Sequence, residues 1–251
     1  MTSFELVALI LLFFITSLVG VVTGSNSLIT VPVMFSFGID PKVAVATNMF
    51  GLTFMSIGAS IPFTRKQMID YRKVFPLILV TLIASTLGAI IVILIEPQSI
   101  KFIVSIAMIA VASFILIDSK SKTNHQKTVS SKKTGWITIL LTFLLGIYGG
   151  VYSGGYVTIL TAVYVAFSGM SFSESVATTK LINVFSSLVA TLVFIWQGLV
   201  DYKLGIILAL TMFIGAYIGA LFATKLNESI LKRIFVATVF ILAIKTFIDA
   251  L

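Results

Sequence analysis

Long, nearly uncharged hydrophobic runs dominate the pattern of this sequence. They cover residues 6–39, 43–64, 74–95, 102–117, 134–173, 181–200, 204–224 and 234–244. A hydrocarbon core about 30 Å thick needs roughly 20 apolar residues of helix, and most of these runs reach that length. The pattern therefore predicts an all-α polytopic membrane protein with eight transmembrane helices.

The same runs recur along the chain with a constant offset of 131 residues. Gly38 corresponds to Gly169, Val45-Ala46-Thr47 to Val176-Ala177-Thr178, Asp70-Tyr71 to Asp201-Tyr202, Gly88-Ala89 to Gly219-Ala220, and Lys101 to Lys232. Such a register indicates a duplicated four-helix unit. We expect one membrane repeat at 1–118, a charged cytoplasmic linker at 119–134 and a second membrane repeat at 135–251. Four crossings per repeat would insert the two copies in the same sense.

The first run of each repeat is too long for one straight crossing, and both are interrupted at corresponding places. The first contains Gly20, the segment 24–27 and Pro32; the second contains Gly146, Gly149-Gly150 and the segment 153–155. Glycine costs about 1 kcal/mol relative to alanine in a helix interior. We therefore expect the first helix of each repeat to be broken, which in transporters often marks the binding site. The alternative is that these glycines only allow close helix packing, which suits Gly20-xxx-Gly24 well.

Composition fits the membrane assignment, with 59% hydrophobic and only 10% charged residues, against about 25% charged in soluble domains. The net charge of +8 comes from basic residues clustered between the apolar runs, where membrane proteins keep topology signals. A cytoplasmic N-terminus would place these basic residues inside: Arg65, Lys66, Arg72, Lys73, Lys120, Lys122, Lys127, Lys132, Lys133 and Lys203. It would leave Lys42, Lys101, Lys225, Lys232 and Arg233 outside. We expect a multi-pass protein of the cell (plasma) membrane with both termini cytoplasmic.

The glycine-rich segments and the motifs that follow them make the sequence resemble the sulfite exporter TauE/SafE family, also called the toluene sulfonate uptake permease family. The likeness covers essentially the whole chain and rests on Gly20-xxx-Gly24 with Pro32, on Gly-x-x-Pro-x-x-Ala-x-Ala-Thr-Asn at 38–48, and on Asp70-Tyr71-Arg72-Lys73. The second half repeats it with Gly149-Gly150, Gly154-Gly155, 174–179 and Asp201-Tyr202-Lys203. The resemblance implies transport of sulfur-containing or other small organic anions, such as sulfite. Family members usually carry a run of glycines where this chain has Ser25-Asn26-Ser27, within the expected site.

An anion that leaves water needs donors, and helix N-termini with bare N–H groups provide them. The broken segments and the paired starts of the following helices offer such donors at matched positions. The predicted substrate-binding residues are Gly24, Ser25, Asn26, Ser27, Thr47, Asn48, Ser153, Gly154, Gly155, Thr178, Thr179, Lys180 and Asn183. Hydrogen bonds between helices would explain any one of these polar residues. Asp70 and Asp201 also recur in register, but a turn or helix cap explains them better.

Lys180 is a basic residue well inside a predicted membrane helix, and the offset pairs it with Met49. A lysine near the centre of such a helix costs about 2.5–3.5 kcal/mol, so it needs a partner or an aqueous route. One interpretation is snorkelling to the interface along its stem. The other, which we favour, is a fixed positive charge that attracts an anion beside the broken helix.

Other classes of function have less support in the sequence. A membrane enzyme would need a metal-binding cluster or catalytic pairs inside the bilayer, but the chain has no cysteine, and its one histidine, His125, lies in the polar linker. We expect no enzyme activity, no cofactor, no catalytic or metal site and no nucleic-acid partner, but a small anionic solute and the lipid bilayer. An anion channel, a transporter of an unrelated small organic acid and a membrane scaffold stay open as alternatives.

Overall fold

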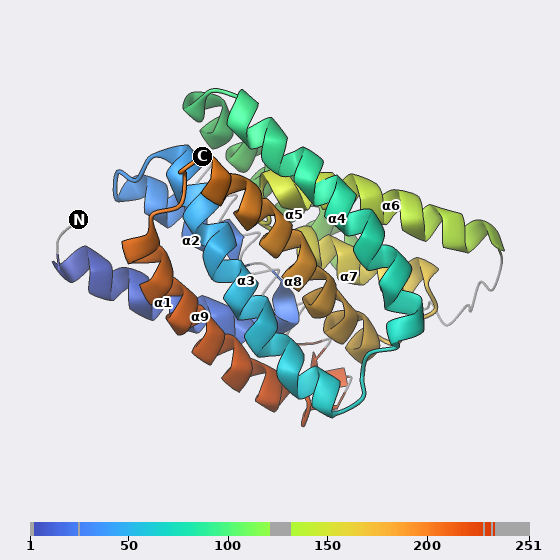
Figure 1. The fold of residues 1–251 in the computed structure, drawn as a ribbon. Helices are drawn as coiled ribbons and strands as arrows, with labels where there is room; N and C mark the ends of the chain where they lie inside the picture. Colours follow the sequence, from blue (N-terminus) through green and yellow to red (C-terminus); the bar gives the residue numbers. More distant parts are fainter. Residues whose placement is uncertain (1–2, 25, 121–131, 228, 232, 234–251) are drawn as a thin grey trace.

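The computed structural model describes residues 3–24, 26–120, 132–227, 229–231 and 233, and within them the chain is helical (Figure 1). Most of the expected linker, including His125, and the final apolar run lie outside these residues. The helices are α1 (Ser3–Thr23), α2 (Ser27–Ser36), α3 (Pro41–Arg65), α4 (Tyr71–Leu94), α5 (Pro97–Lys120), α6 (Lys132–Val151), α7 (Tyr156–Phe167), α8 (Phe172–Trp196) and α9 (Tyr202–Ala223).

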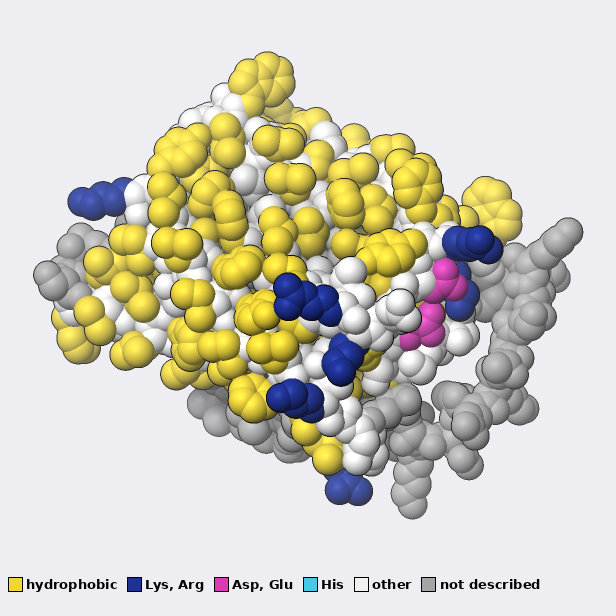
Figure 2. All heavy atoms as spheres, turned by 60° about the horizontal axis from the view of Figure 1, so that its bottom comes forward, with side chains coloured by type: hydrophobic (Ala, Val, Ile, Leu, Met, Phe, Trp, Pro, Cys, Tyr) yellow, Lys and Arg dark blue, Asp and Glu magenta, His cyan; other side chains and the backbone are white. Residues whose placement is uncertain are grey.

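Five of these helices, α1, α3, α4, α8 and α9, are long and apolar enough to cross a membrane. Large hydrophobic side chains stand on the outside of the bundle, for example Phe75 and Leu94 of α4. Figure 2 shows hydrophobic side chains over much of one face, with most of the visible Lys and Arg gathered toward its lower and right parts. An apolar belt of this kind suits lipid, so the molecule is a polytopic membrane protein.

The long helices form two sets that run in opposite directions. Gly215 and Gly219 of α9 approach Phe14 and Leu18 of α1 in the same order along both helices, so α1 and α9 are parallel. The contacts of α3 with α9 also advance together, and so do those of α4 with α6. These close approaches need glycine, because a Cβ at Gly219 would lie 2.2 Å from the Leu18 carbonyl oxygen.

Helices α3 and α8 occupy corresponding sequence positions but run in opposite directions. They begin 131 residues apart, at Pro41 and Phe172, and end 131 residues apart. Thr53 of α3 contacts Thr191 of α8, whereas Ser56 contacts Asn183, so the order of contacts is reversed. Figure 1 shows the same arrangement, with α3 and α9 descending to the lower right and α4 and α8 returning. The expectation that corresponding helices insert in the same sense is therefore wrong.

The reason is that each long first run is a helical hairpin, not one crossing with a kink. Thr142 of α6 contacts Tyr164 of α7, and Thr138 contacts Ser168, which makes these two helices antiparallel. Helix α2 likewise runs opposite to α3 and hence opposite to α1. A hairpin adds one reversal to the first half of the chain, and this reversal inverts everything that follows.

The hairpins also change which loops share an end of the bundle. End A holds Ser3 and the loops 37–40, 95–96 and 197–201; end B holds the loops 66–70 and 168–171 and the start of α6. The N-terminal residues and the start of α6 thus lie at opposite ends, so the N-terminus and the linker do not share a face as expected. Lys203 moves to end A and Lys225 moves to end B. The C-terminus lies outside the described residues.

Short polar side chains fix where the long helices start. The carboxylate of Asp70 accepts from Arg72 N at 3.1 Å, and that of Asp201 accepts from Leu204 N at 3.0 Å. Asp40 and Ser171 cap α3 and α8 in the same way. These caps satisfy backbone donors that the first helical turn leaves open. The interpretation of Asp70 and Asp201 as caps is confirmed.

Candidate substrate site between the helix hairpins

Each hairpin turns at a glycine in the left-handed region. Gly24 has φ +73° and Gly155 has φ +76°, and the two positions are 131 residues apart. A side chain would strain the backbone there, so glycine is the residue that such a turn favours. The helices that follow, α2 and α7, begin without a side-chain cap at Asn26 or Gly155. The first N–H group of α7, that of Tyr156, donates to the Ser153 carbonyl, and the remaining N–H groups of the two first turns form positive helix ends in the protein interior.

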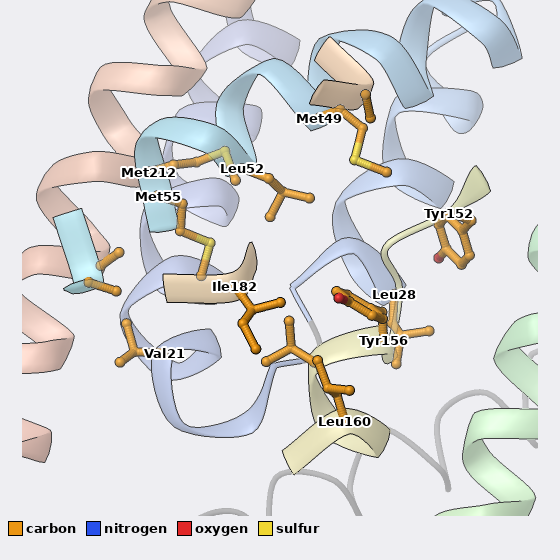
Figure 3. Packing of buried hydrophobic residues seen from close by; sticks show 14 of the residues in the cluster. Val21, Leu28, Met49, Leu52, Met55, Tyr152, Tyr156, Leu160, Ile182 and Met212 are labelled. Atoms are coloured by element: carbon orange, nitrogen blue, oxygen red, sulfur yellow. The ribbon is translucent and has the colours of Figure 1, made fainter. Parts of the chain in front are cut away.

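The two hairpin tips contact each other inside the bundle. Thr158 Oγ1 of α7 donates to the carbonyl of Thr23 at 2.5 Å, and the Tyr152 hydroxyl donates to the carbonyl of Ser27 at 2.8 Å. A Cβ at Gly24 would lie 2.7 Å from Thr158 N, so the tips touch at backbone distance. Figure 3 shows Tyr152 and Tyr156 from the second tip beside Leu28 of the first. Segments more than 120 residues apart in sequence therefore build one polar centre.

Lys180 reaches this centre from α8. Its side chain is 3% exposed, and its ammonium donates to the carbonyl of Gly20 in the last turn of α1 at 2.7 Å. No carboxylate of the described residues forms an ion pair with it. The negative end of the α1 dipole stabilises the cation only in part, with about half a charge. The ammonium points to a hairpin tip instead of the membrane surface, so the snorkelling interpretation does not describe this structure.

A matched hydrogen bond links each hairpin to the long helix that follows it. Thr30 Oγ1 donates to Asn48 Oδ1 at 2.8 Å, and Thr161 Oγ1 lies 3.2 Å from Thr179 Oγ1. Both residues of the second pair lie 131 positions after those of the first. Asn48 Nδ2 also donates to Ser27 Oγ at 2.9 Å. These bonds hold the start of α2 and the body of α7 in place.

Two buried asparagines leave oxygen atoms without a partner among the described residues. Asn26 Nδ2 lies 3.3 Å from Met55 Sδ, and Asn183 Nδ2 donates to Ser56 Oγ at 2.7 Å. Their Oδ1 atoms accept no hydrogen bond. Buried polar atoms are usually paired, so each of these is a position where a ligand or water can bind.

The structure gives no contact between a hairpin tip and three of the predicted site residues. Thr47 faces α9, where its hydroxyl accepts from Asp201 N at 3.1 Å. Thr178 is fully buried, and its hydroxyl has no hydrogen-bond partner that would link it to a tip. Ser25 lies outside the described residues. Thr47 is therefore better explained by the fixing of α9 than by contact with a solute.

The Ser153–Gly155 segment shapes the second tip mainly through its backbone. Ser153 is buried, and its carbonyl accepts from Tyr156 N at 3.2 Å. The carbonyl of Gly154 accepts from the Tyr148 hydroxyl, and a Cβ at Gly154 would lie 2.4 Å from the Tyr152 ring. A side chain at Gly154 would displace Tyr152 from the opposite tip.

The sequence pattern did not identify Gly20, Tyr152 or Thr158 as members of this centre. Gly20 acts through its carbonyl, which has no side-chain signature. Tyr152 corresponds to Val21 at the repeat offset, so a search for matched polar pairs passes it over. Thr158 does correspond to Ser27, and that pairing could have revealed it.

Broken helices that meet in the interior of an apolar bundle, with donors and a buried cation at the break, define a membrane transporter. The sequence matches the family described as "Sulfite exporter TauE/SafE" over residues 9–246, and the chain belongs to this family. This membership agrees with the resemblance seen in the glycine-rich segments.

Curated relatives match over nearly their whole length. The chain is 27% identical over 237 residues to "Probable membrane transporter protein ORF9" of Sinorhizobium sp, covering 94% of this chain and 90% of that protein. It is 23% identical over 236 residues to a "Probable membrane transporter protein" of Haemophilus influenzae, covering 94% and 92%. "Probable membrane transporter protein YfcA" of Escherichia coli is 23% identical over 243 residues, covering 95% and 89%. The relatives share the class of protein, a membrane transporter.

Proposed function

We propose that this protein transports small anions, and that sulfur oxyanions and organosulfonates such as sulfite are its substrates. The observation that carries the proposal is Lys180, a buried lysine with no carboxylate partner among the described residues, whose ammonium lies at the junction of two broken helices. The family name supports the sulfur-containing class of substrate.

The charges around the junction favour a solute of negative charge. Carboxylates with a described position stand at the ends of helices: Glu5, Asp40, Asp70, Glu96, Glu174 and Asp201. Each hairpin brings one positive and one negative helix end to its tip, and these partial charges roughly cancel. Lys180 then gives the centre an excess of about one positive charge. An anion neutralises that charge, whereas a cation would add to it.

The donors at the tips complete this binding site. The first turns of α2 and α7 offer backbone N–H groups, which bind oxyanions without adding a second fixed charge. The proposal assigns to the same site these buried polar residues: Asn26, Ser27, Asn48, Ser153, Thr179 and Asn183. In this proposal the substrate binds beside the junction of the tips and displaces the Lys180 ammonium from the Gly20 carbonyl.

The proposal includes a duplicated unit with inverted orientation. Positive φ angles occur in three pairs at the 131-residue offset: Gly24 with Gly155, Gly38 with Gly169, and Gln67 with Gly198. The units correspond to 1–118 and 135–251, and the hairpin of each replaces the single first crossing of an eight-helix arrangement. Inverted repeats support alternating access, because exchange of their two conformations turns an outward-open site into an inward-open one.

We further propose that end B faces the cytoplasm of a plasma-membrane protein. End B carries Arg65, Lys66, Arg72, Lys73 and Lys225, whereas end A carries Lys42, Lys101 and Lys203. The positive-inside rule favours the more basic end as cytoplasmic. The N-terminus then lies outside, opposite to the linker.

Anion-induced stabilisation of the purified protein tests the function. Binding to the folded state raises the melting temperature by mass action, so titration with sulfite, methanesulfonate and acetate gives affinities. Lys180→Met should weaken sulfur-anion binding at least about tenfold, because a hydrogen bond to a charged group contributes about 1.5–3 kcal/mol. Lys180→Arg should keep part of the binding.

Lys42→Met is the matched control. The Lys42 ammonium also donates to a backbone carbonyl, that of Ile93, at 2.7 Å, but at end A of the bundle. This variant should bind anions as the wild type does. Equal affinities of wild type and Lys180→Met, with both proteins folded, would refute the proposed site.

A further inference from the structure

A second cluster of buried hydroxyls lies beside the tip of the second hairpin, between α4, α7 and α8. It consists of Thr81, Ser85, Tyr156 and Ser186, each at most 2% exposed. Tyr156 is the first residue of α7, and its ring packs on Gly149, where a Cβ would lie 3.0 Å away. The cluster therefore adjoins the uncapped N-terminus of α7.

The hydrogen atoms of this cluster can be counted. Ser85 Oγ donates its one hydrogen to the carbonyl of Gly146 at 3.0 Å, so the 2.7 Å contact between Ser85 and Ser186 must be donated by Ser186. The Tyr156 hydroxyl lies beside those of Thr81 and Ser186, but among the described residues neither Tyr156 nor Thr81 forms a hydrogen bond of good geometry. Tyr156 and Thr81 are thus two buried hydroxyls that are not committed to a well-formed hydrogen bond.

At three of the four positions the residue at the repeat offset is apolar. At the 131-residue offset Thr81 corresponds to Met212, Ser85 to Ala216 and Ser186 to Met55. All three counterparts are buried, and Figure 3 shows Met55 and Met212 packed with apolar neighbours. Apolar side chains fill three of the four equivalent places, while Tyr156 corresponds to Ser25, so packing alone does not require the hydroxyls of Thr81, Ser85 and Ser186.

We propose that Tyr156 and Thr81 form an oxygen-selective subsite, in which their hydroxyls donate to an oxygen of the transported anion. This inference rests on the proposed function and adds a specificity-determining pair to it. Lys180 and the helix ends attract any small anion, because they respond to charge. The two neutral hydroxyls need an acceptor atom at a fixed place, which sulfonate and sulfite oxygens supply. A site built to hydrogen-bond its ligand discriminates strongly against ligands that lack the bonding group.

The test compares two anions of equal charge in the purified full chain. Methanesulfonate presents three oxygens, whereas thiocyanate presents none, and ligand-induced thermal shifts give both affinities. Tyr156→Phe should weaken methanesulfonate binding about ten- to a hundredfold, the range expected for a hydrogen bond to a charged group. Thiocyanate binding should change less than about threefold under the same principle of hydrogen-bond specificity.

Tyr164→Phe is the control on the same helix. Tyr164 is also fully buried, but its hydroxyl lies 3.2 Å from Thr142 Oγ1 and so has a partner. Loss of that hydroxyl should lower the melting temperature of the free protein and leave both affinities unchanged. Tyr156→Phe should leave the melting temperature unchanged or raise it, because it removes an unsatisfied donor.

The outcomes separate the subsite from the transport function. Unchanged methanesulfonate binding by Tyr156→Phe, or an equal loss for both anions, overturns the subsite while wild-type binding upholds the function. A wild-type protein that binds neither anion overturns both. Thr81→Val, which keeps volume, repeats the test if Tyr156→Phe does not fold, and it should show the same selective loss.

Discussion

The two hairpins have the same backbone but different chemistry. Both turn at a left-handed glycine, Gly24 or Gly155, and both are tied to the next long helix by a threonine hydroxyl. Yet the long helix of the second half carries Lys180 where that of the first carries Met49, and Thr81, Ser85 and Ser186 of the hydroxyl cluster have methionine or alanine as counterparts. The difference teaches that backbone geometry positions the site, while one half supplies its charge and specificity.

Electrostatics explains why the charge occurs once. A lysine inside the membrane costs about 2.5–3.5 kcal/mol. A second lysine at position 49 would place two cations near one junction without a carboxylate among the described residues to neutralise them. One lysine and one methionine keep the backbone symmetric and the excess charge small.

The comparison of the two halves depends on their inverted orientation in the membrane. Lys66 and Gln197 end α3 and α8 at matched, exposed positions, and the structure places them at opposite ends. In intact cells, an impermeant thiol reagent should label Gln197→Cys and leave Lys66→Cys unlabelled. The chain has no native cysteine, so the background is clean. Equal labelling of both variants, before and after permeabilisation, would contradict the inversion.

Moving the charge from one half to the other sharpens the comparison. Lys180→Met should lose anion binding, and Met49→Lys added to it should restore affinity to within about tenfold, since each factor of ten is about 1.4 kcal/mol. Gly20, whose carbonyl accepts from Lys180, corresponds at the repeat offset to Val151. The new ammonium is therefore expected to face the carbonyl of Val151. Thermal-shift titration measures the recovery. A folded double variant with no binding would show that the halves are not interchangeable.

Because the two tips are in contact, substitution of Gly24 should destabilise the fold far more than substitution of Gly38, although both glycines are left-handed. Gly38→Ala should lower the free energy of unfolding by about 1–2 kcal/mol, because its φ of +75° is strained and its surroundings are open. Gly24→Ala should cost about 2–5 kcal/mol, since overpacking against Thr158 adds to the same strain. Denaturant unfolding in detergent compares them. Equal losses would mean that the tips do not touch.

The smallest expected effect concerns the matched threonines. Thr30→Val and Thr161→Val should each lower the free energy of unfolding by about 0.6 kcal/mol, the average for a hydrogen bond between membrane helices. Similar losses in the same unfolding assay would support equivalent roles. A loss for one variant alone would show that only one of the two bonds stabilises its hairpin.

Much of this architecture could be predicted from residues alone. Apolar runs identified the membrane-spanning class because length and hydrophobicity act locally. Glycine clusters predicted the breaks at 24–27 and 153–155, and the structure ends α1 and α6 there. Asp70 and Asp201 were correctly interpreted as caps, since capping involves neighbours two or three residues away.

Only the tertiary structure decided the direction of the chain after each break. A glycine permits a turn but does not say whether the next helix continues or reverses, because that depends on which surface is left to pack against. Helix α2 reverses and packs on α3, and this reversal inverts the second half. Lys203 and Lys225 each therefore lie at the end of the bundle opposite to the one expected from the sequence. The partner of Lys180 is decided in the same way, because the Gly20 carbonyl lies 160 residues away along the chain and becomes its neighbour only through the antiparallel packing of the two halves.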